Sequence, residues 1–132
     1  MTHFVDTSGL LALLSAGDRF HQQAYEAWVG WVRGDVPLVT SNYVLVETTA
    51  LVQSRLGFNA VTALQTDILP VLHVEWVDVT LHQAAAAILV TIRQQELSLV
   101  DCTSFELMRR LGLHTIFGFD RHFAAQGFTC LP

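Results

Sequence analysis

The chain has 132 residues, of which 52% are hydrophobic and only 14% are charged, and its formal net charge is -5 with histidine neutral. This length suits one domain with its own core, so we expect residues 1–132 to form a single domain. The negative charge argues against a protein that coats nucleic acid with a basic surface, although a nuclease can reach phosphate through metal ions. No apolar run approaches the ~20 residues of a transmembrane helix and no secretory signal opens the chain, so we expect a cytoplasmic protein without membrane contact.

Strands and helices are predicted to alternate along the chain. In order, we expect a strand at 4–5, a helix at 9–14, a helix through 24–32, a strand at 38–39, helices at 43–56 and 60–69, a strand at 74–79, helices at 80–95 and 101–111, and strands at 115–119 and 128–130. Residues suited to begin these helices are Thr7 or Ser8, Asp18, Ser41 or Asn42, Thr80 and Asp101. This alternation predicts an α/β sandwich in which helices flank a mainly parallel central sheet.

Four acidic residues stand out because they lie at the ends of apolar segments or inside an apolar helix: Asp6, Glu47, Asp101 and Asp120. A carboxylate beside a buried strand carries a large desolvation cost, and the chain contains no lysine that could neutralise it. A divalent cation is a partner that can neutralise several carboxylates at once. Because ligands of parallel sheets bind beyond the carboxyl ends of the strands, we expect the four acids to converge there.

The segments around these acids resemble the PIN-domain ribonucleases, and among them the VapC toxins of bacterial and archaeal toxin–antitoxin pairs. The segments are Phe-Val-Asp-Thr-Ser, Ser-Asn-Tyr-Val-Leu-Val-Glu-Thr, Leu-Val-Asp-Cys-Thr-Ser-Phe and Gly-Phe-Asp-Arg-His-Phe, and the resemblance covers essentially the whole chain. It implies a PIN-like α/β/α sandwich, an endoribonuclease that depends on Mg²⁺ or Mn²⁺, and a toxin role. It also implies two protein partners, a cognate antitoxin whose C-terminal tail wraps the toxin and a second copy of the chain in a homodimer.

The family's four acids fall on Asp6, Glu47, Asp101 and Asp120. We expect Asp6 and Asp101 to be the direct metal ligands, while Glu47 and Asp120 complete the site, hold metal-bound water or position a second ion. Residues predicted to contact the RNA substrate are Ser8, Thr103 and Arg121, although helix capping explains Ser8 equally well and a solvated side chain is the alternative for Arg121.

One position departs from the family pattern, which usually places Ser or Thr two residues before the fourth acid. Here that position is Gly118, so a hydroxyl that would orient a carboxylate or a metal-bound water is missing. We therefore expect Asp120 to be less critical than Asp101, and Gly118→Thr to raise activity or tighten Mg²⁺ binding. The alternative is that Gly118 permits a close backbone approach, in which case threonine would destabilise the fold.

Three other functions remain open at this point. A stand-alone PIN nuclease in RNA processing or decay has the same fold and metal but no antitoxin. A catalytically inactive module that binds RNA or protein is supported only by Gly118. A phosphoacceptor signalling domain also places aspartates at strand ends, but such sites normally add a lysine, and this chain has none.

Overall fold

The computed structural model describes residues 1–132 and contains one five-stranded sheet with the order β3-β2-β1-β4-β5. All four pairs of neighbouring strands are parallel. The strands are β1 (His3–Val5), β2 (Leu38–Ser41), β3 (His73–Glu75), β4 (Thr115–Phe117) and β5 (Thr129–Leu131). The predicted α/β fold is therefore confirmed, with a sheet that is parallel throughout.

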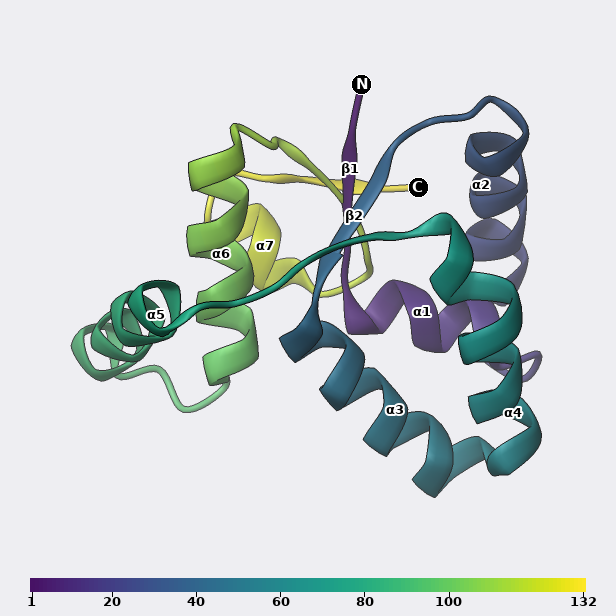
Figure 1. Ribbon diagram of the computed structural model, residues 1–132, viewed down its shortest axis with the longest axis horizontal. Coiled ribbons are helices and arrows are strands. Elements are labelled where there is room, and N and C mark those ends of the chain that lie inside the picture. The colour runs from purple at the N-terminus through teal and green to yellow at the C-terminus, as the bar shows by residue number, and fades with distance from the viewer.

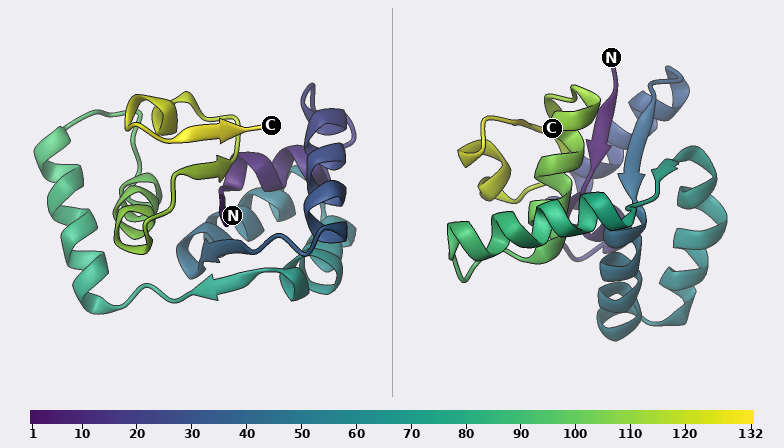
Figure 2. Two further views of the ribbon diagram at one scale, coloured as in Figure 1. Left: turned by 90° about the horizontal axis from the view of Figure 1, so that it is seen from above. Right: turned by 60° about the vertical axis from the view of Figure 1, so that its left-hand side comes forward.

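Helices connect these strands, as parallel neighbours require. They are α1 (Thr7–Leu14), α2 (His21–Arg33), α3 (Asn42–Leu56), α4 (Phe58–Ala63), α5 (Val79–Ile92), α6 (Leu99–Leu111) and α7 (Arg121–Ala125). Figure 1 shows α5 and α6 on one side of the strands and α2 and α4 on the other, while α1 and α3 begin where β1 and β2 end. In Figure 2, α5 lies on the outside of the molecule and packs against α6. None of the helices has the length and apolar character needed to cross a membrane.

The core lies on both faces of the two central strands, β1 and β4. Phe4 and Phe117 are fully buried, as expected for parallel strands covered by helices on both sides. The ring of Phe117 packs against Trp28 and Trp31 of α2, with ring centroids 5.7 and 5.2 Å away. At Gly9, α1 approaches β4 so closely that a Cβ atom would lie 2.5 Å from the Phe117 carbonyl oxygen. The carboxyl end of β1 is thus fixed against that of β4.

Aspartates begin two helices where the sequence predicted hydroxyl residues. Asp6, rather than Thr7 or Ser8, caps α1, and its carboxylate accepts a hydrogen bond from the Ser8 backbone N–H. Asp78, rather than Thr80, caps α5. Asp, Ser and Thr are comparably good N-caps, so the choice among neighbours depends on where the preceding strand ends.

Other element boundaries also differ from those predicted. Helix α6 begins at Leu99 with Ser98 as its cap, so Asp101 lies in the first turn instead of opening the helix. The strand predicted over 74–79 spans His73–Glu75, and the segment 60–69 continues from α4 into a π-helical turn, Leu64–Ile68, and a 3-10 turn, Leu69–Val71. Ser41 caps α3 as predicted.

His3 is a buried histidine at the amino end of β1, whereas the acids lie at the carboxyl ends of the strands. Its Nδ1 lies 2.6 Å from Thr115 Oγ1, which donates its own proton to the Thr2 carbonyl, so Nδ1 carries the ring proton. The other ring nitrogen, Nε2, is buried without a hydrogen-bond partner. Burial first, and the positive N-terminus second, lower the pKa of His3.

We expect this histidine to destabilise the fold in mild acid. The unfolded chain binds a proton at His3 below about pH 6.5, whereas the folded chain does so only at lower pH, so its contribution to stability is present above that value and lost as the pH falls below it. Urea unfolding from about pH 7.5 to about pH 5 should show a smaller pH slope in His3→Gln than in the unmodified chain. The exposed His114→Gln is the control, and equal slopes for His3→Gln and the unmodified chain would contradict the prediction.

Candidate active site

Three acids from distant parts of the chain meet at the carboxyl ends of β1 and β4. These strands are neighbours at the centre of the sheet, and the chain leaves β1 toward β2 on one side while β4 lies on the other. Such a switch in strand order opens a crevice at the strand ends. Asp6 directly follows β1, Asp120 precedes α7 after β4, and Asp101 reaches the same crevice from the first turn of α6.

Asp6 is the most deeply buried of these acids, with 4% of its surface exposed. Its backbone N–H donates to the Phe117 carbonyl at 3.1 Å, which fixes the residue between the two central strands. Burial raises the pKa of Asp6 to about 7; hydrogen bonds from Ser8 oppose the rise and the negative charge of Asp101 adds to it. Without a cation, this carboxyl group is only partly ionised near neutral pH.

Asp101 is held in place by a reciprocal pair of hydrogen bonds at the start of α6. Its carboxylate accepts from the Ser98 backbone N–H at 3.0 Å, and its own N–H donates to Ser98 Oγ at 3.1 Å. Burial is the main cause of its raised pKa, the bond from Ser98 opposes the rise, and the charge of Asp120 adds to it. Asp101 therefore interacts through its negative charge with both Asp6 and Asp120.

Asp120 caps the short helix α7 and has a neighbour that the sequence reasoning missed. Its Oδ1 accepts a hydrogen bond from the His122 backbone N–H at 2.9 Å, and the ring Nδ1 of His122 lies 2.8 Å from the same oxygen. That second contact lacks hydrogen-bond alignment, so it is an ion pair only when the ring is protonated. His122 also limits the rise in the pKa of Asp101, so it belongs to the site. The sequence signal for this contact was a histidine placed two residues after an acid that caps a helix.

Glu47 lies at the margin of this group. It is half-buried on α3, next to Thr48, whose hydroxyl donates to Thr7 Oγ1 at 3.0 Å and ties α3 to the start of α1. It lines a groove of about 320 Å³ that also includes Asn42, Tyr43, Val46 and Val100. The pKa shifts of Asp6 and Asp101 have no contribution from Glu47 among their causes. The structure thus brings Asp6, Asp101 and Asp120 together and leaves Glu47 beside them.

The residues present fit a divalent cation that retains water. Carboxylate oxygens are ligands that hard cations prefer, and neither Asp6 nor Asp101 has an ion-pair partner among the side chains. No three His, Cys, Asp or Glu side chains converge as closely as direct coordination of one ion by all of them requires. A cation here would be held by few direct ligands, which suits Mg²⁺ because it keeps several of its waters.

The three residues predicted to contact substrate differ in exposure and in their hydrogen bonds. Thr103 is fully buried and its hydroxyl donates to the Leu99 carbonyl within α6 at 2.8 Å, so this geometry does not support a substrate contact there. The hydroxyl of Ser8 is engaged with Asp6 Oδ2 at 2.8 Å. Arg121 is exposed beside Asp120 and forms no ion pair, so it stays a prediction for phosphate binding.

The hydroxyl of Ser8 lies beside Gly118 and contacts Asp6, not Asp120. Ser8 Oγ lies where a side chain at position 118 would begin, 2.9 Å from the position of a Cβ atom. Asp120 is oriented by α7 and His122 instead. The lower importance of Asp120 relative to Asp101 stays a prediction, and so does the gain expected from Gly118→Thr. The close approach of Ser8 to Gly118 favours the alternative that glycine is needed there for packing.

Comparison with known proteins agrees with this geometry. A family model described as the PIN domain matches residues 3–128. The 23S rRNA-specific endonuclease VapC20 of Mycobacterium tuberculosis is 41% identical over 127 residues, which cover 95% of this chain and 94% of that protein. Its crystal structure, described as that of a sarcin-ricin loop cleaving toxin, matches with a TM-score of 0.84 at 37% identity over 98% of this chain and 97% of that chain. FitAcB from Neisseria gonorrhoeae shares the fold, with a TM-score of 0.68 at 17% identity, over 100% of this chain and 97% of that chain.

The chain therefore belongs to the PIN-domain family. The resemblance to PIN-domain ribonucleases and VapC-type toxins that the sequence indicated is confirmed, and so are the PIN-like fold and the class of enzyme, a nuclease.

The burial of Asp6 predicts a pH-dependent gain in stability when its charge is removed. The folded carboxyl has a pKa of about 7 and the unfolded one about 3.9, so the folded state binds more protons between these values and loses stability as the pH rises through them. In chelator, Asp6→Asn should melt several degrees higher than the unmodified chain at about pH 8, with a smaller gain at about pH 5.

The control for this experiment is Asp35→Asn, because Asp35 is exposed in a turn with a φ of 53° that asparagine also tolerates. It should show no such difference between the two pH values. An Asp6→Asn chain that melts below the unmodified one at the higher pH would contradict the assignment of a buried, unneutralised carboxylate.

Proposed function

We propose that this chain is a Mg²⁺- or Mn²⁺-dependent endoribonuclease and the toxin of a type II toxin–antitoxin pair. The observation that carries the proposal is the buried carboxyl of Asp6 next to that of Asp101, with no cationic side chain paired to either. Two such groups bind a hard cation well and are otherwise costly to keep together. The membership of the chain in a nuclease family supports the same conclusion.

Asp6 and Asp101 would hold the cation, and Asp120 and Glu47 would bind its water molecules from the sides. When bound, the cation supplies charge stabilisation at the phosphate and lowers the pKa of a bound water. The chain itself orients the ligands: Ser98 fixes Asp101 and the α7 backbone fixes Asp120. Arg121, exposed next to Asp120, would contact the RNA backbone.

We propose 23S rRNA as the substrate, since the relative at 41% identity is named for that activity and nearly the full length of both chains aligns. The match to the structure of a sarcin-ricin loop cleaving toxin favours the same loop. Cleavage at a different site on the same RNA, or of another RNA, would keep the metal chemistry and change only this part of the proposal.

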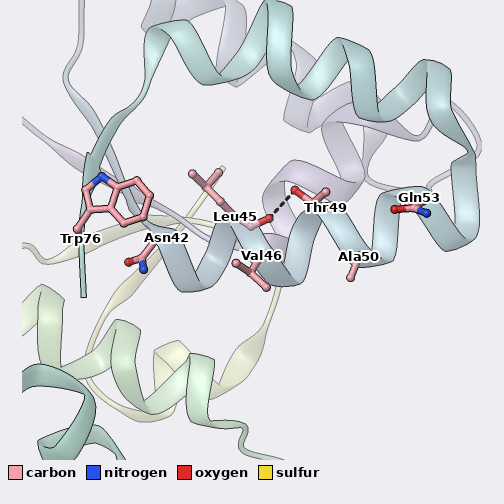
Figure 3. Close-up of a pocket in the computed structure, with 7 residues that line it drawn as sticks. All are labelled: Asn42, Leu45, Val46, Thr49, Ala50, Gln53 and Trp76. Atoms are coloured by element: carbon pink, nitrogen blue, oxygen red, sulfur yellow. Dashed lines mark hydrogen bonds between the residues drawn. The ribbon is translucent and has the colours of Figure 1, made fainter. Parts of the chain in front are cut away.

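The proposed protein partners would cover apolar surface along α3. Figure 3 shows a groove lined by Asn42, Leu45, Val46, Thr49, Ala50 and Gln53 of α3 and by Trp76 from the segment after β3. Its volume is about 430 Å³, and Trp76 and Val46 are 75% and 70% exposed. It shares Asn42 and Val46 with the groove beside Glu47. An apolar antitoxin segment lying along α3 would therefore reach the edge of the active site.

The metal requirement gives the first test. Incubation with ribosomes should yield discrete cleaved 5′ ends in 23S rRNA with Mg²⁺ or Mn²⁺ and none in EDTA. Asp101→Asn keeps the shape of the side chain but removes an anionic ligand, so cleavage should fall by more than ~100-fold. Asp35→Asn, far from the site in an exposed turn, should cleave normally. Full activity in excess chelator, or near-normal turnover by folded Asp101→Asn, would rule out this mechanism.

The partner proposal is tested by co-expression with the product of the reading frame immediately upstream. Val46→Asp in the groove should weaken co-purification of that product by placing a charge against an apolar segment, whereas Val90→Asp is the control because Val90 is equally exposed, at 72%, on α5. Light scattering of the chain alone should report a homodimer at micromolar concentration. A monomer, or equal co-purification by both variants, would contradict these assignments.

A further inference from the structure

The hydroxyl of Ser8 occupies the space in which a side chain at position 118 would begin. A Cβ atom at Gly118 would lie 2.9 Å from Ser8 Oγ, 3.3 Å from Asp6 Cβ and 3.5 Å from Asp6 Oδ2. The first of these distances is shorter than normal packing allows, so a residue larger than glycine must displace Ser8. Gly118 is buried and has no unusual φ, so its role is close packing and not backbone freedom.

Ser8 uses this position to join two segments that carry acids. Its Oγ donates to Asp6 Oδ2 at 2.8 Å and accepts from the Phe119 backbone N–H at 2.9 Å. The Ser8 backbone N–H adds a longer bond of 3.3 Å to the same carboxylate oxygen. One hydroxyl therefore links the carboxylate that follows β1 to the loop that leads from β4 to Asp120.

We propose that Ser8 is a positioning residue that orients the Asp6 carboxylate and fixes the loop 118–120, and that Gly118 is the glycine that makes room for it. The effect of this pair on metal binding rests on the function proposed above; its effect on the fold does not.

The contacts of Ser8 distinguish this role from the two suggested by the sequence. Helix capping of α1 is performed by Asp6, so Ser8 is not needed for it. Substrate binding requires a free donor, but the single hydroxyl proton of Ser8 is directed at Asp6. Loss of the hydroxyl leaves a backbone N–H at Phe119 without its partner and leaves Asp6 with only the longer bond.

The packing part is tested by a double-mutant cycle on thermal unfolding in chelator. Gly118→Ala should lower the melting temperature in the unmodified chain and lower it clearly less in the Ser8→Ala background, where the blocking oxygen is gone. Gly30→Ala is the matched control, since a Cβ there meets nothing within 4 Å, and it should not depend on Ser8. Equal losses caused by Gly118→Ala in both backgrounds would overturn the proposal.

The positioning part is tested by Mn²⁺ affinity, measured by calorimetry without RNA. Ser8→Ala should weaken Mn²⁺ binding by roughly 10–100-fold, the usual loss when a hydrogen bond to a metal ligand is removed. Gly118→Ser alone should also weaken it, because the two side chains collide. The combined variant Ser8→Ala/Gly118→Ser places a hydroxyl one bond beyond a Cβ that lies 3.5 Å from Asp6 Oδ2, and it should bind Mn²⁺ more tightly than Ser8→Ala.

The outcomes separate this inference from the function it rests on. Unchanged Mn²⁺ affinity in Ser8→Ala, or tighter binding by Gly118→Ser alone, overturns the positioning role. If Gly118→Ser does not fold, Ser8→Ala and the combined variant still decide the matter. If the unmodified chain neither binds Mn²⁺ nor cleaves RNA, the proposed function fails. The double-mutant cycle on thermal unfolding still tests the contact between Ser8 and Gly118, because it needs no metal.

Discussion

The burial of the Asp6 carboxyl beside Asp101 is the constraint on which the rest of the site depends. Burial and the neighbouring negative charge raise the pKa of Asp6 to about 7, and no cationic side chain is paired with it. A fold selected for stability alone would not keep such a group, because an apolar or amide side chain would cost less. A bound divalent cation removes the penalty, so the strain at this position and the proposed activity have the same origin.

The parallel sheet creates this situation by its topology. Strands β1 and β4 lie side by side with their carboxyl ends together, so residues far apart in the chain reach one crevice. The first turn of α6 brings Asp101 to the same place, and Ser98 holds it there through two hydrogen bonds. The apolar core beneath, including Phe117 and Trp28, packs against the strands whose ends carry Asp6 and lead to Asp120.

Features of the fold and site that depend on neighbouring residues in the sequence could be predicted. Features that depend on contacts between distant segments could not. The strands and the acids that follow them were predictable because short apolar runs end in a charge, and family resemblance supplied the fold. Some predicted helix caps were wrong, because Asp6, Thr7 and Ser8 are all suitable N-cap residues. The internal hydrogen bond of Thr103 and the contact of Ser8 with Gly118 were not predictable, because they depend on side-chain directions and on segments that meet only in the folded chain.

The most direct measurement of the central claim is proton release on metal binding. Calorimetry of Mn²⁺ binding near pH 6, in two buffers with different ionisation enthalpies, counts the protons displaced. Because Asp6 is largely protonated there, binding should release about one proton, and fewer near pH 8.5. Asp6→Asn should bind weakly and release none from this position. Tight Mn²⁺ binding with no proton release near pH 6, or unchanged binding in Asp6→Asn, would contradict the account.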